Sequence, residues 1–326
     1  MQRSRRQVIA GLGALMLAGL GRPARAQTYP SRQVRIIVPG APGSAIDIRA
    51  RQIASKLSEA WKQPVIVDNR PGAGGIIGTE LAARAAADGH TLIYGSIGTH
   101  SINASLYGKL PYDPIKDFAP IITVLIGPLL LVVNPKLPIK SVADLIAFSK
   151  STPGGLSYAS SGSGQGSHLV GVMFNMQAKT ELVHVPYKSQ TAGLTDVISG
   201  QVGLMFDTPS TCMHHIQSSA LRAIATTRGK RFPPLPDMPT VAESGLPGFD
   251  MAVWGAMFAP AGTPAPIIEQ LNADIGKALR APDVRDSIIS VGQEPGGDRP
   301  EQLGAFVKAE VEKWRKVVKE SGARAD

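Results

Sequence analysis

Three segments rich in glycine and serine hold the residues of this sequence best suited to chemistry: 39–47, 95–100 and 159–168. Glycine lets the backbone approach a ligand closely, and hydroxyl groups donate directed hydrogen bonds. Where such a segment precedes a helix, free amide groups and the positive end of the helix dipole favour an anion. The same composition is also ordinary turn and capping chemistry, so one segment alone is weak support for a ligand.

Each of these segments follows a predicted strand and precedes a predicted helix. In the first third of the chain, β-branched runs predict strands at 34–38, 64–68 and 91–94, and helical spacing predicts helices at 45–61 and 76–87. Later strands are predicted at 119–125, 129–133, 156–159, 182–185, 202–206, 221–226 and 251–259, and later helices at 142–150, 168–178, 191–199, 266–280 and 301–320. This alternation predicts parallel sheets covered by helices.

The strands at 119–125 and 129–133 follow each other almost directly, as when a chain leaves one sheet and enters another. We therefore predict two α/β domains with a hinge between them. Residues 27–126 and 250–326 would form domain 1, and residues 127–249 would form domain 2. Two crossovers make a hinge, and a hinged pair of domains makes a cleft. Glycine and serine loops facing each other across it could hold one carboxylate without arginine or lysine.

Residues 1–26 have the pattern of an export signal. A basic start precedes the apolar run 8–20, and the small residues around Ala24 and Ala26 predict cleavage near Ala26. The adjacent Arg5 and Arg6 resemble a twin-arginine signal, and an ordinary Sec signal is the alternative. Both routes predict a periplasmic protein. No later segment reaches the ~18 apolar residues of a membrane span.

Composition narrows the possible partners. The net charge is +9, but residues 1–26 hold five arginines and no acid, so the rest of the chain carries +4. These basic residues are spread along the chain, so no nucleic-acid partner is expected. Cys212 is the one cysteine. A single cysteine excludes an intrachain disulfide and a cysteine-based metal site, and we expect Cys212 to be packed in the core.

Motifs for enzymes are missing or incomplete. The segment 72–78 loosely resembles a dinucleotide loop, but its glycine spacing is wrong and no acid follows at a strand end. No serine lies in a G-x-S-x-G motif. His214 and His215 are adjacent, so on a helix they point to different faces and cannot chelate a metal. We expect no catalytic residue, no metal, no cofactor and no enzymatic activity. The remaining histidines are expected to be structural.

The chain resembles the extracytoplasmic solute receptors of tripartite tricarboxylate transporters, also called the Bug family, over about residues 29–326. The matching segments include 67–75 (VDNRPGAGG), 98–103 (GTHSIN), 110–114 (LPYDP), 116–120 (KDFAP), 158–162 (YASSG), 184–188 (HVPYK), 235–243 (LPDMPTVAE) and 258–264 (FAPAGTP). So many ordered matches make chance unlikely. The resemblance implies a two-domain periplasmic binding protein of type II, the Venus flytrap fold. It also implies a small carboxylate ligand and delivery to integral membrane subunits of a transporter. Nothing in the sequence demands more than a monomer.

The resemblance also implies a binding site, carried over by position. In such receptors main-chain amides and hydroxyls of the first and third loops hold a ligand carboxylate. The corresponding residues are Ser44, Ala45, Ile46 and Asp47 in domain 1, and Ser160, Ser161, Gly162, Ser163, Gly164 and Gln165 in domain 2, with Asp207 on the cleft wall. Thr99 and His100 match a further family motif whose role at the ligand is less defined. From the residues alone, Asp47 is better explained as a helix-capping group.

Two departures from the family pattern concern the first loop. The family usually has an aromatic residue where Gly40 stands, and a hydroxyl residue near Ile46. Loss of the ring would enlarge the cleft, and Ile46 would add apolar surface. We therefore hypothesise a ligand with one carboxylate and a bulkier, less polar body, for example an aromatic one.

Two alternative functions remain open at the level of the sequence. The closed receptor could report to a sensor kinase of a two-component system instead of feeding a transporter. A twin-arginine signal also often accompanies proteins that fold around a cofactor, so an exported flavin or nicotinamide enzyme is the second alternative.

Overall fold

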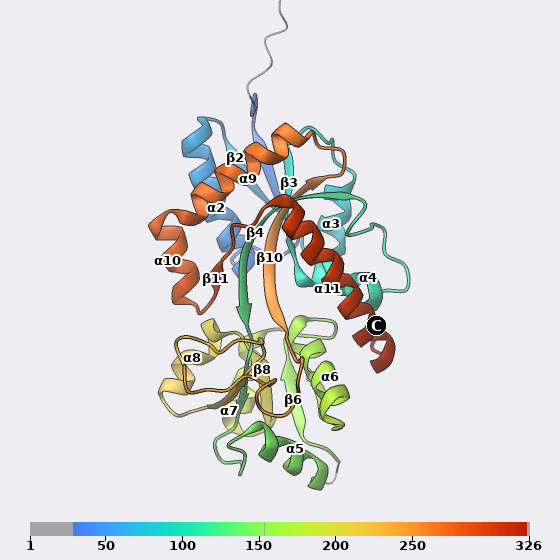
Figure 1. Ribbon diagram of the computed structural model, residues 1–326, viewed down its shortest axis with the longest axis vertical. Coiled ribbons are helices and arrows are strands. Elements are labelled where there is room, and N and C mark those ends of the chain that lie inside the picture. The colour runs from blue at the N-terminus through green and yellow to red at the C-terminus, as the bar shows by residue number, and fades with distance from the viewer. Residues whose placement is uncertain (1–28, 153, 325–326) are drawn as a thin grey trace, which may run out of the picture.

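The computed structural model describes residues 29–152 and 154–324, so the predicted export signal lies outside the described residues. The described chain forms two lobes, each with its own sheet (Figure 1). The first sheet has the order β11-β4-β10-β3-β1-β2. Its strands are β1 (Val34–Val38), β2 (Val65–Asn69), β3 (Thr91–Ser96), β4 (Phe118–Pro128), β10 (Ala252–Pro260) and β11 (Glu294–Pro295).

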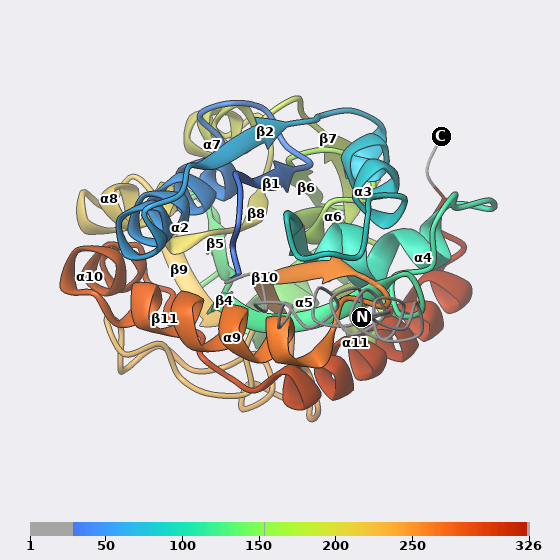
Figure 2. The same cartoon turned by 90° about the horizontal axis from the view of Figure 1, so that it is seen from above.

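Strand β1 pairs in parallel with both β2 and β3, as the alternating strand and helix pattern predicts. Strand β10 runs antiparallel between β3 and β4 and carries the returning chain. The helical segments of this lobe are α2 (Ala45–Trp61), η1 (Ala73–Gly75), α3 (Ile76–Ala83), η2 (Gly98–Ile102), α4 (Asn103–Leu106), α9 (Ala265–Arg280), α10 (Pro282–Ser290) and α11 (Pro300–Ser321). Seen from above, α9 and α11 lie along the same side of the molecule (Figure 2).

The second sheet has the order β7-β6-β8-β5-β9. Its strands are β5 (Leu130–Val133), β6 (Ser157–Ser160), β7 (Val183–Pro186), β8 (Leu204–Asp207) and β9 (Arg222–Thr226). Its helices are α5 (Val142–Ser151), α6 (Gly166–Ala178), α7 (Gln190–Ser199) and α8 (Pro209–Gln217). Strand β6 is parallel to both neighbours, whereas β5 is antiparallel to β8 and β9.

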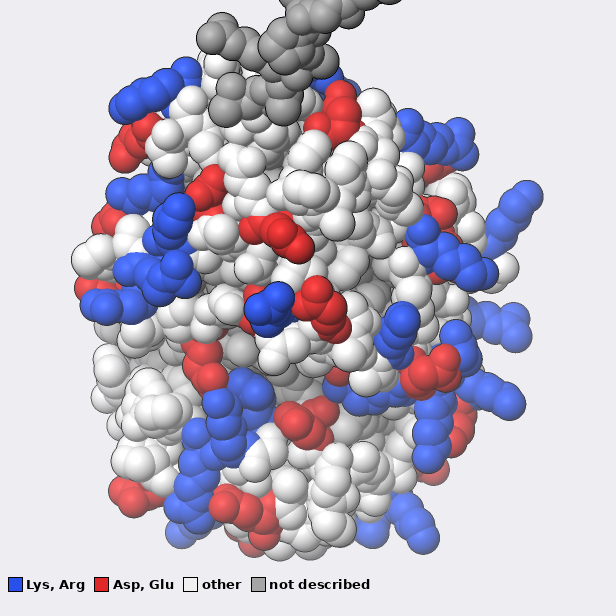
Figure 3. Space-filling view, turned by 45° about the horizontal axis from the view of Figure 1, so that its top comes forward, with Lys and Arg blue, Asp and Glu red and all other residues white. Residues whose placement is uncertain are grey.

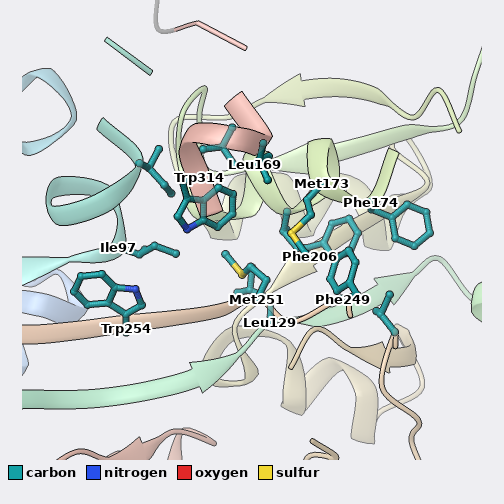
Figure 4. Close-up of a cluster of buried hydrophobic side chains, with 14 of the residues drawn as sticks. Ile97, Leu129, Leu169, Met173, Phe174, Phe206, Phe249, Met251, Trp254 and Trp314 are labelled. Carbon is teal, nitrogen blue, oxygen red and sulfur yellow. The ribbon is translucent and has the colours of Figure 1, made fainter. Parts of the chain in front are cut away.

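The chain passes between the lobes twice. Only Leu129 separates β4 of the first sheet from β5 of the second, and the segment after β9 leads back into β10 (Figure 1). The two-lobed α/β fold expected from the sequence is therefore confirmed. The sheets meet in a continuous apolar core that includes Ile97, Leu129 and Leu169 (Figure 4).

Helix α11 closes one side of this shared core, because it packs against α4 of the first lobe and α6 of the second. Its Trp314 is fully buried, and the carboxylate of Glu310 accepts hydrogen bonds from the indole nitrogens of Trp254 (3.0 Å) and Trp314 (3.2 Å). A buried carboxylate is tolerated when it is bonded in this way. Burying a tryptophan stabilises by several kcal/mol, so α11 holds the two lobes together on this side.

Some elements differ from the sequence prediction. The helix predicted at 76–87 ends at Ala83, since Arg84 already has a non-helical ψ of 1°, and the chain turns at Asp88, whose carboxylate accepts the His90 amide at 2.9 Å, and at Gly89, with a φ of 81°. Such side-chain bonds to nearby amides compete with helix geometry. The elements α4, α10 and β11 were not predicted, since each is short and lacks a clear apolar period.

Candidate ligand-binding site

The first loop, residues 39–47, connects β1 to α2. Ser44 is the N-cap residue of α2, yet its hydroxyl makes no capping bond and is buried without a partner among the described residues. Within the described chain, the amides of Ala45, Ile46 and Asp47 also meet no protein acceptor. A helix start leaves such amides free. The loop therefore offers three N–H donors at the positive end of a 17-residue helix.

Asp47 holds this loop in shape from within. Its carboxylate accepts the Gly43 amide at 2.8 Å, the Arg51 Nε at 3.0 Å and the Asn69 Nδ2 at 2.9 Å. Burial works to raise the pKa of Asp47, but hydrogen bonds from Arg51, Gly43 and Asn69 outweigh it and lower that pKa. Asp47 therefore stays ionised and is engaged by the loop itself; it accepts the amide of Gly43, before the N-cap residue Ser44, and leaves the first amides of α2 free.

Asn69 and Arg51 are supporting residues that the sequence did not single out. Asn69 also donates to the Gly40 carbonyl at 3.1 Å and accepts from Arg51 at 3.0 Å. The parallel pairing of β1 and β2 sets Val38 opposite Asn69, which brings Asn69 to the start of the first loop.

Gly40 does not leave an open space, which corrects the expectation of an enlarged cleft. A Cβ atom at Gly40 would lie 2.5 Å from Cδ1 of Ile46 and 3.2 Å from the hydroxyl of Ser44. Contacts this short do not occur in proteins without movement. Ile46 thus occupies the volume that a larger residue at position 40 would need.

The third loop, residues 159–168, connects β6 to α6, and much of its own backbone is used to shape it. The Ser161 amide donates to the Ser167 hydroxyl at 3.0 Å, and the Gly162 amide donates to the Ser160 hydroxyl at 3.1 Å. The Gln165 amide donates to the Gly162 carbonyl at 3.2 Å. In the described chain, the amides that keep no protein acceptor here are those of Ser163, Gly166 and Ser167.

Two imidazoles lie behind the third loop, and sequence analysis missed their connection to it. The Gly164 amide donates to Nδ1 of His168 at 3.0 Å, and Nε2 of His184 lies 2.6 Å from the Ser160 hydroxyl. The two rings stack with centroids 3.9 Å apart. His184 comes from β7, so only the strand pairing of the folded chain brings it here.

Asp207 ends β8, next to β6 in the second sheet. It is fully buried, and its carboxylate accepts the Thr208 amide at 2.8 Å and the Thr211 hydroxyl at 2.6 Å. Burial raises the pKa of Asp207 to about 6, although the bonds from Thr211 and Thr208 lower it. Its side chain is thus engaged by the start of α8.

Thr99 and His100 serve the structure of the second loop. The Thr99 hydroxyl accepts the Ser96 amide at 3.0 Å and lies 2.9 Å from Nδ1 of His100. His100 stacks on Phe258 at 4.0 Å, and its burial lowers the pKa of the imidazole to about 3. This neutral, packed histidine matches the structural role expected for it.

The lobes meet near these loops. The first and second loops leave the carboxyl ends of the parallel strands β1 and β3, which share one edge of the first sheet. A Cβ atom placed on Gly164 would lie only 2.3 Å from Cδ2 of Leu106, which follows the second loop in the first lobe. A Cβ atom placed on Gly166 would similarly lie 3.4 Å from Cε of Met251. The third loop therefore borders the first lobe and, like the first two loops, follows the carboxyl end of a strand, where α/β proteins bind ligands.

The donors collected here suit an anion. The free groups are main-chain amides and serine hydroxyls, in two helix starts. Among the described residues no cluster of histidine, cysteine or acidic side chains is suited to a metal ion. On the face shown in Figure 3, lysine and arginine are interspersed with acidic residues and form no continuous basic stripe. No helix within 29–152 or 154–324 has both the length and the apolarity to cross a bilayer.

A two-lobed α/β chain with amide-rich loops at the carboxyl ends of its strands has the architecture of a periplasmic solute-binding protein. The family model described as tripartite tricarboxylate transporter family receptor matches residues 49–323. The chain belongs to this family, whose members are periplasmic receptors of the Bug type and not enzymes. It is similar to the protein BugT of Bordetella pertussis, with 37% identity over 308 residues, covering 94% of each chain.

Solved structures agree with this assignment. An R. palustris protein solved with adipate is 38% identical, with a TM-score of 0.79, covering 90% of this chain and 98% of that one. MatC from Rhodopseudomonas palustris, with bound malate, is 34% identical, with a TM-score of 0.76, covering 89% of this chain and 100% of that one. The sensor and enzyme alternatives are not favoured by these relatives.

Proposed function

We propose that this protein is the receptor of a tripartite tricarboxylate-type transporter and that it captures a small carboxylate between its lobes. The observation that carries the proposal is the pair of helix starts with unpaired amides, at Ala45–Asp47 and around Ser163–Ser167. Amides at a helix start bind carboxylates without a cationic side chain. Adipate in one similar structure and malate in another support this ligand class.

The proposed binding residues are Gly40, Ser44, Ala45, Ile46, Asp47, Thr99, Ser160, Ser161, Gly162, Ser163, Gly164, Gln165 and Asp207. Their proposed contributions differ. The amides of the first turn of α2 and of Ser163 would bind the carboxylate. Asp47, Thr99 and Asp207, whose side chains already have partners, would shape the walls.

The ligand body is proposed to be aliphatic or otherwise slender near the first loop, since Ile46 fills the volume beside Gly40. This revises the hypothesis of a bulky aromatic acid. Residues 27–126 with 250–326 and residues 127–249 would be the two domains that close on the ligand. The change of sheet between β4 and β5, and between β9 and β10, supports two such domains, although β4 stays in the first sheet as far as Pro128, two residues beyond the proposed bound. Closure delivers the ligand only if the ligand favours the closed state.

We further propose that residues 1–26 are removed on export, with cleavage near Ala26, and that the mature receptor acts in the periplasm as a monomer. Its proposed partners are the integral membrane subunits of the transporter, with no cofactor, no nucleic acid and no catalytic step.

Isothermal titration calorimetry of the mature chain with adipate, malate and benzoate tests the function. The matched control is adipamide, which has the shape of adipate without its charge. We expect at least one aliphatic carboxylate to bind and the diamide to fail. Equal binding of adipamide, or binding of none of the three acids, would refute the proposal. Tight binding of benzoate alone would refute the revised ligand body and leave the carboxylate site intact.

A further inference from the structure

The third loop cannot hold its shape by backbone preference alone. Gly162 has a φ of 127° and Gly164 a φ of 77°, conformations that glycine adopts as easily as many others. Ser163 between them and Gln165 after them are exposed. A flexible loop pays conformational entropy when it is fixed around a ligand. A loop that is fixed beforehand binds more tightly.

Two stacked imidazoles provide this fixation, one at each end of the loop. His168, on the first turn of α6, accepts the Gly164 amide at its Nδ1 (3.0 Å). His184, from β7, approaches the Ser160 hydroxyl with its Nε2 (2.6 Å). The ring planes are 21° apart, with centroids 3.9 Å apart, so each ring fixes the orientation of the other. The Ser160 hydroxyl in turn accepts the Gly162 amide at 3.1 Å.

The geometry determines the protonation state of His168. A backbone amide can only donate, so the Nδ1 atom that receives the Gly164 N–H carries no proton. His168 is therefore neutral, with its proton on Nε2. A second proton would place an N–H at Nδ1 against the amide hydrogen of Gly164 and break this bond.

The surroundings of the pair also favour neutral rings. Among the described residues, Tyr158 is a titratable side chain in contact with the pair: its ring centroid lies 5.1 Å from that of His184, and its hydroxyl donates to the His168 carbonyl at 3.1 Å. Burial raises the pKa of Tyr158, so it remains uncharged. Within the described chain no carboxylate forms an ion pair with either imidazole. A charge on one ring would be poorly solvated and would repel a charge on the other.

We propose that His168, oriented by its stacked partner His184, is a positioning residue for carboxylate binding, and that the third loop keeps its binding shape only while this pair is neutral. The inference rests on the proposed carboxylate function, because it concerns the loop that would bind the ligand. This positioning role of the two histidines differs from that of a residue that only packs in the core, and also from that of a residue that touches the ligand.

Because the pair must stay neutral, ligand binding should weaken at acid pH. Burial, together with the neighbouring His168, lowers the pKa of His184 to about 4, and burial lowers that of His168. The loop should therefore keep its shape at neutral pH and lose it as pH falls towards 4. The ligand's own carboxylates protonate in a similar range, so the measurement must compare variants at each pH.

Three variants separate positioning from folding. His168→Leu removes the Nδ1 acceptor and puts an apolar side chain of similar size in its place. His168→Asn restores an acceptor, because Oδ1 of asparagine replaces Nδ1, and it cannot titrate. His214→Asn changes an exposed histidine of α8 and is the matched control.

With adipate and malate as probes, we expect His168→Leu to weaken binding about tenfold or more at pH 7, and His168→Asn to restore most of it. His214→Asn should bind as the unaltered protein does. As pH falls from 7 to 4, the affinity of the unaltered protein should drop further than that of His168→Asn. Unchanged binding by His168→Leu, or parallel pH profiles for the unaltered protein and His168→Asn, would overturn the inference.

Amide hydrogen exchange, measured without ligand, tests the positioning role of His168 separately from the proposed carboxylate binding. Exchange at Gly164 should be faster in His168→Leu than in the unaltered protein and normal in His168→Asn. If neither probe binds the unaltered protein, the carboxylate proposal fails for these acids, while exchange still decides the positioning. If His168→Leu does not fold, the pH comparison with His168→Asn decides alone.

Discussion

The first loop, before α2, and the third loop, before α6, present the same kind of donor from opposite lobes, but different chemistry fixes them. Asp47 holds the first loop as an ionised carboxylate, with Arg51 and Asn69 as its partners. Neutral groups hold the third loop, namely two imidazoles and the hydroxyls of Ser160 and Ser167.

Two loops with the same composition can therefore respond oppositely to pH. A carboxylate with a lowered pKa stays charged well into acid, whereas buried neutral histidines take up protons as pH falls. The first loop should therefore form the stable half of the site and the third loop the sensitive half.

Asp47→Ala should have the largest effect, because it removes the acceptor at the centre of the first loop. It leaves the Gly43 amide and the Asn69 amide group without that acceptor and Arg51 without its ion pair. Asn69 is half-buried and Gly43 and Arg51 are exposed, so water replaces part of the lost bonds, and the free energy of unfolding should fall by about 1–2 kcal/mol. Carboxylate affinity should fall by about 100-fold or more. Chemical denaturation and calorimetry measure the two quantities.

The control for this change is Glu301→Ala, in the first turn of α11. Glu301 is also an acid at a helix start, but it is exposed and forms only a loose pair with Arg299 at 3.6 Å. Its removal should change stability by no more than about 0.5 kcal/mol. Similar losses for both variants would contradict a special role of Asp47 in the first loop.

Ala45→Pro tests the amide donors themselves. Ala45 is the first residue of α2, where proline is tolerated, and Ser44 already has a ψ of 160° that suits a following proline. The change deletes one N–H and little else, so affinity should fall about 10- to 100-fold while the melting temperature stays nearly constant.

Ala265→Pro is the matched control for Ala45→Pro. Ala265 is the exposed first residue of α9, a helix start that belongs to neither the first nor the third loop. It should alter neither affinity nor melting temperature appreciably. If Ala45→Pro binds adipate and malate as tightly as this control does, the α2 amides do not hold the carboxylate.

A double-mutant cycle at Gly40 and Ile46 tests the packing of the first loop. Gly40→Ala forces a Cβ to within 2.5 Å of Cδ1 of Ile46; because this atom ends a flexible, half-buried side chain, we expect a loss of about 1 kcal/mol in stability. Ile46→Ala removes the obstructing atoms, and the double variant should recover most of this loss. Strictly additive losses, measured by denaturation, would show that the two positions do not share one volume.

The sequence predicts this fold well where the local pattern is strong. Strand β1 and helix α2 have the predicted bounds, because a β-branched run and a clear 3.6-residue period each end at sharp turn signals. The glycine and serine loops were also evident, since their composition is itself the signal. Short elements without an apolar period, such as α4 and α10, were not predicted.

The supporting residues of the site could not be predicted in the same way. Asn69 reaches Asp47 across 22 positions and His184 reaches Ser160 across 24, each through the pairing of parallel strands. Such contacts depend on strand order and register, which a single sequence does not contain. The same holds for Gly40 and Ile46, where the sequence showed a missing side chain and only the structure shows what fills its place.

Asp207 extends the contrast between the lobes, because it is the buried acid of the second lobe and has no arginine partner among the described residues. The pKa of Asp47 is lowered, whereas burial raises that of Asp207 to about 6. A carboxyl with a raised pKa stabilises the fold when protonated, and this contribution is lost as pH rises through about 6. Between pH 5 and pH 7 the loss should be about 1 kcal/mol.

Asp207→Asn should remove this loss, because an amide does not titrate. The buried histidines act in the opposite direction: their pKa values are lowered, so they reduce stability as pH falls below about 6.5, where unfolded histidine takes up protons. They are present in both proteins, so the difference between the two denaturation profiles reports Asp207 alone. The stability of Asp207→Asn relative to the unaltered protein should rise from pH 5 to pH 7. Parallel profiles would mean that Asp207 is ionised across this range and that both lobes hold their buried acid in the same state.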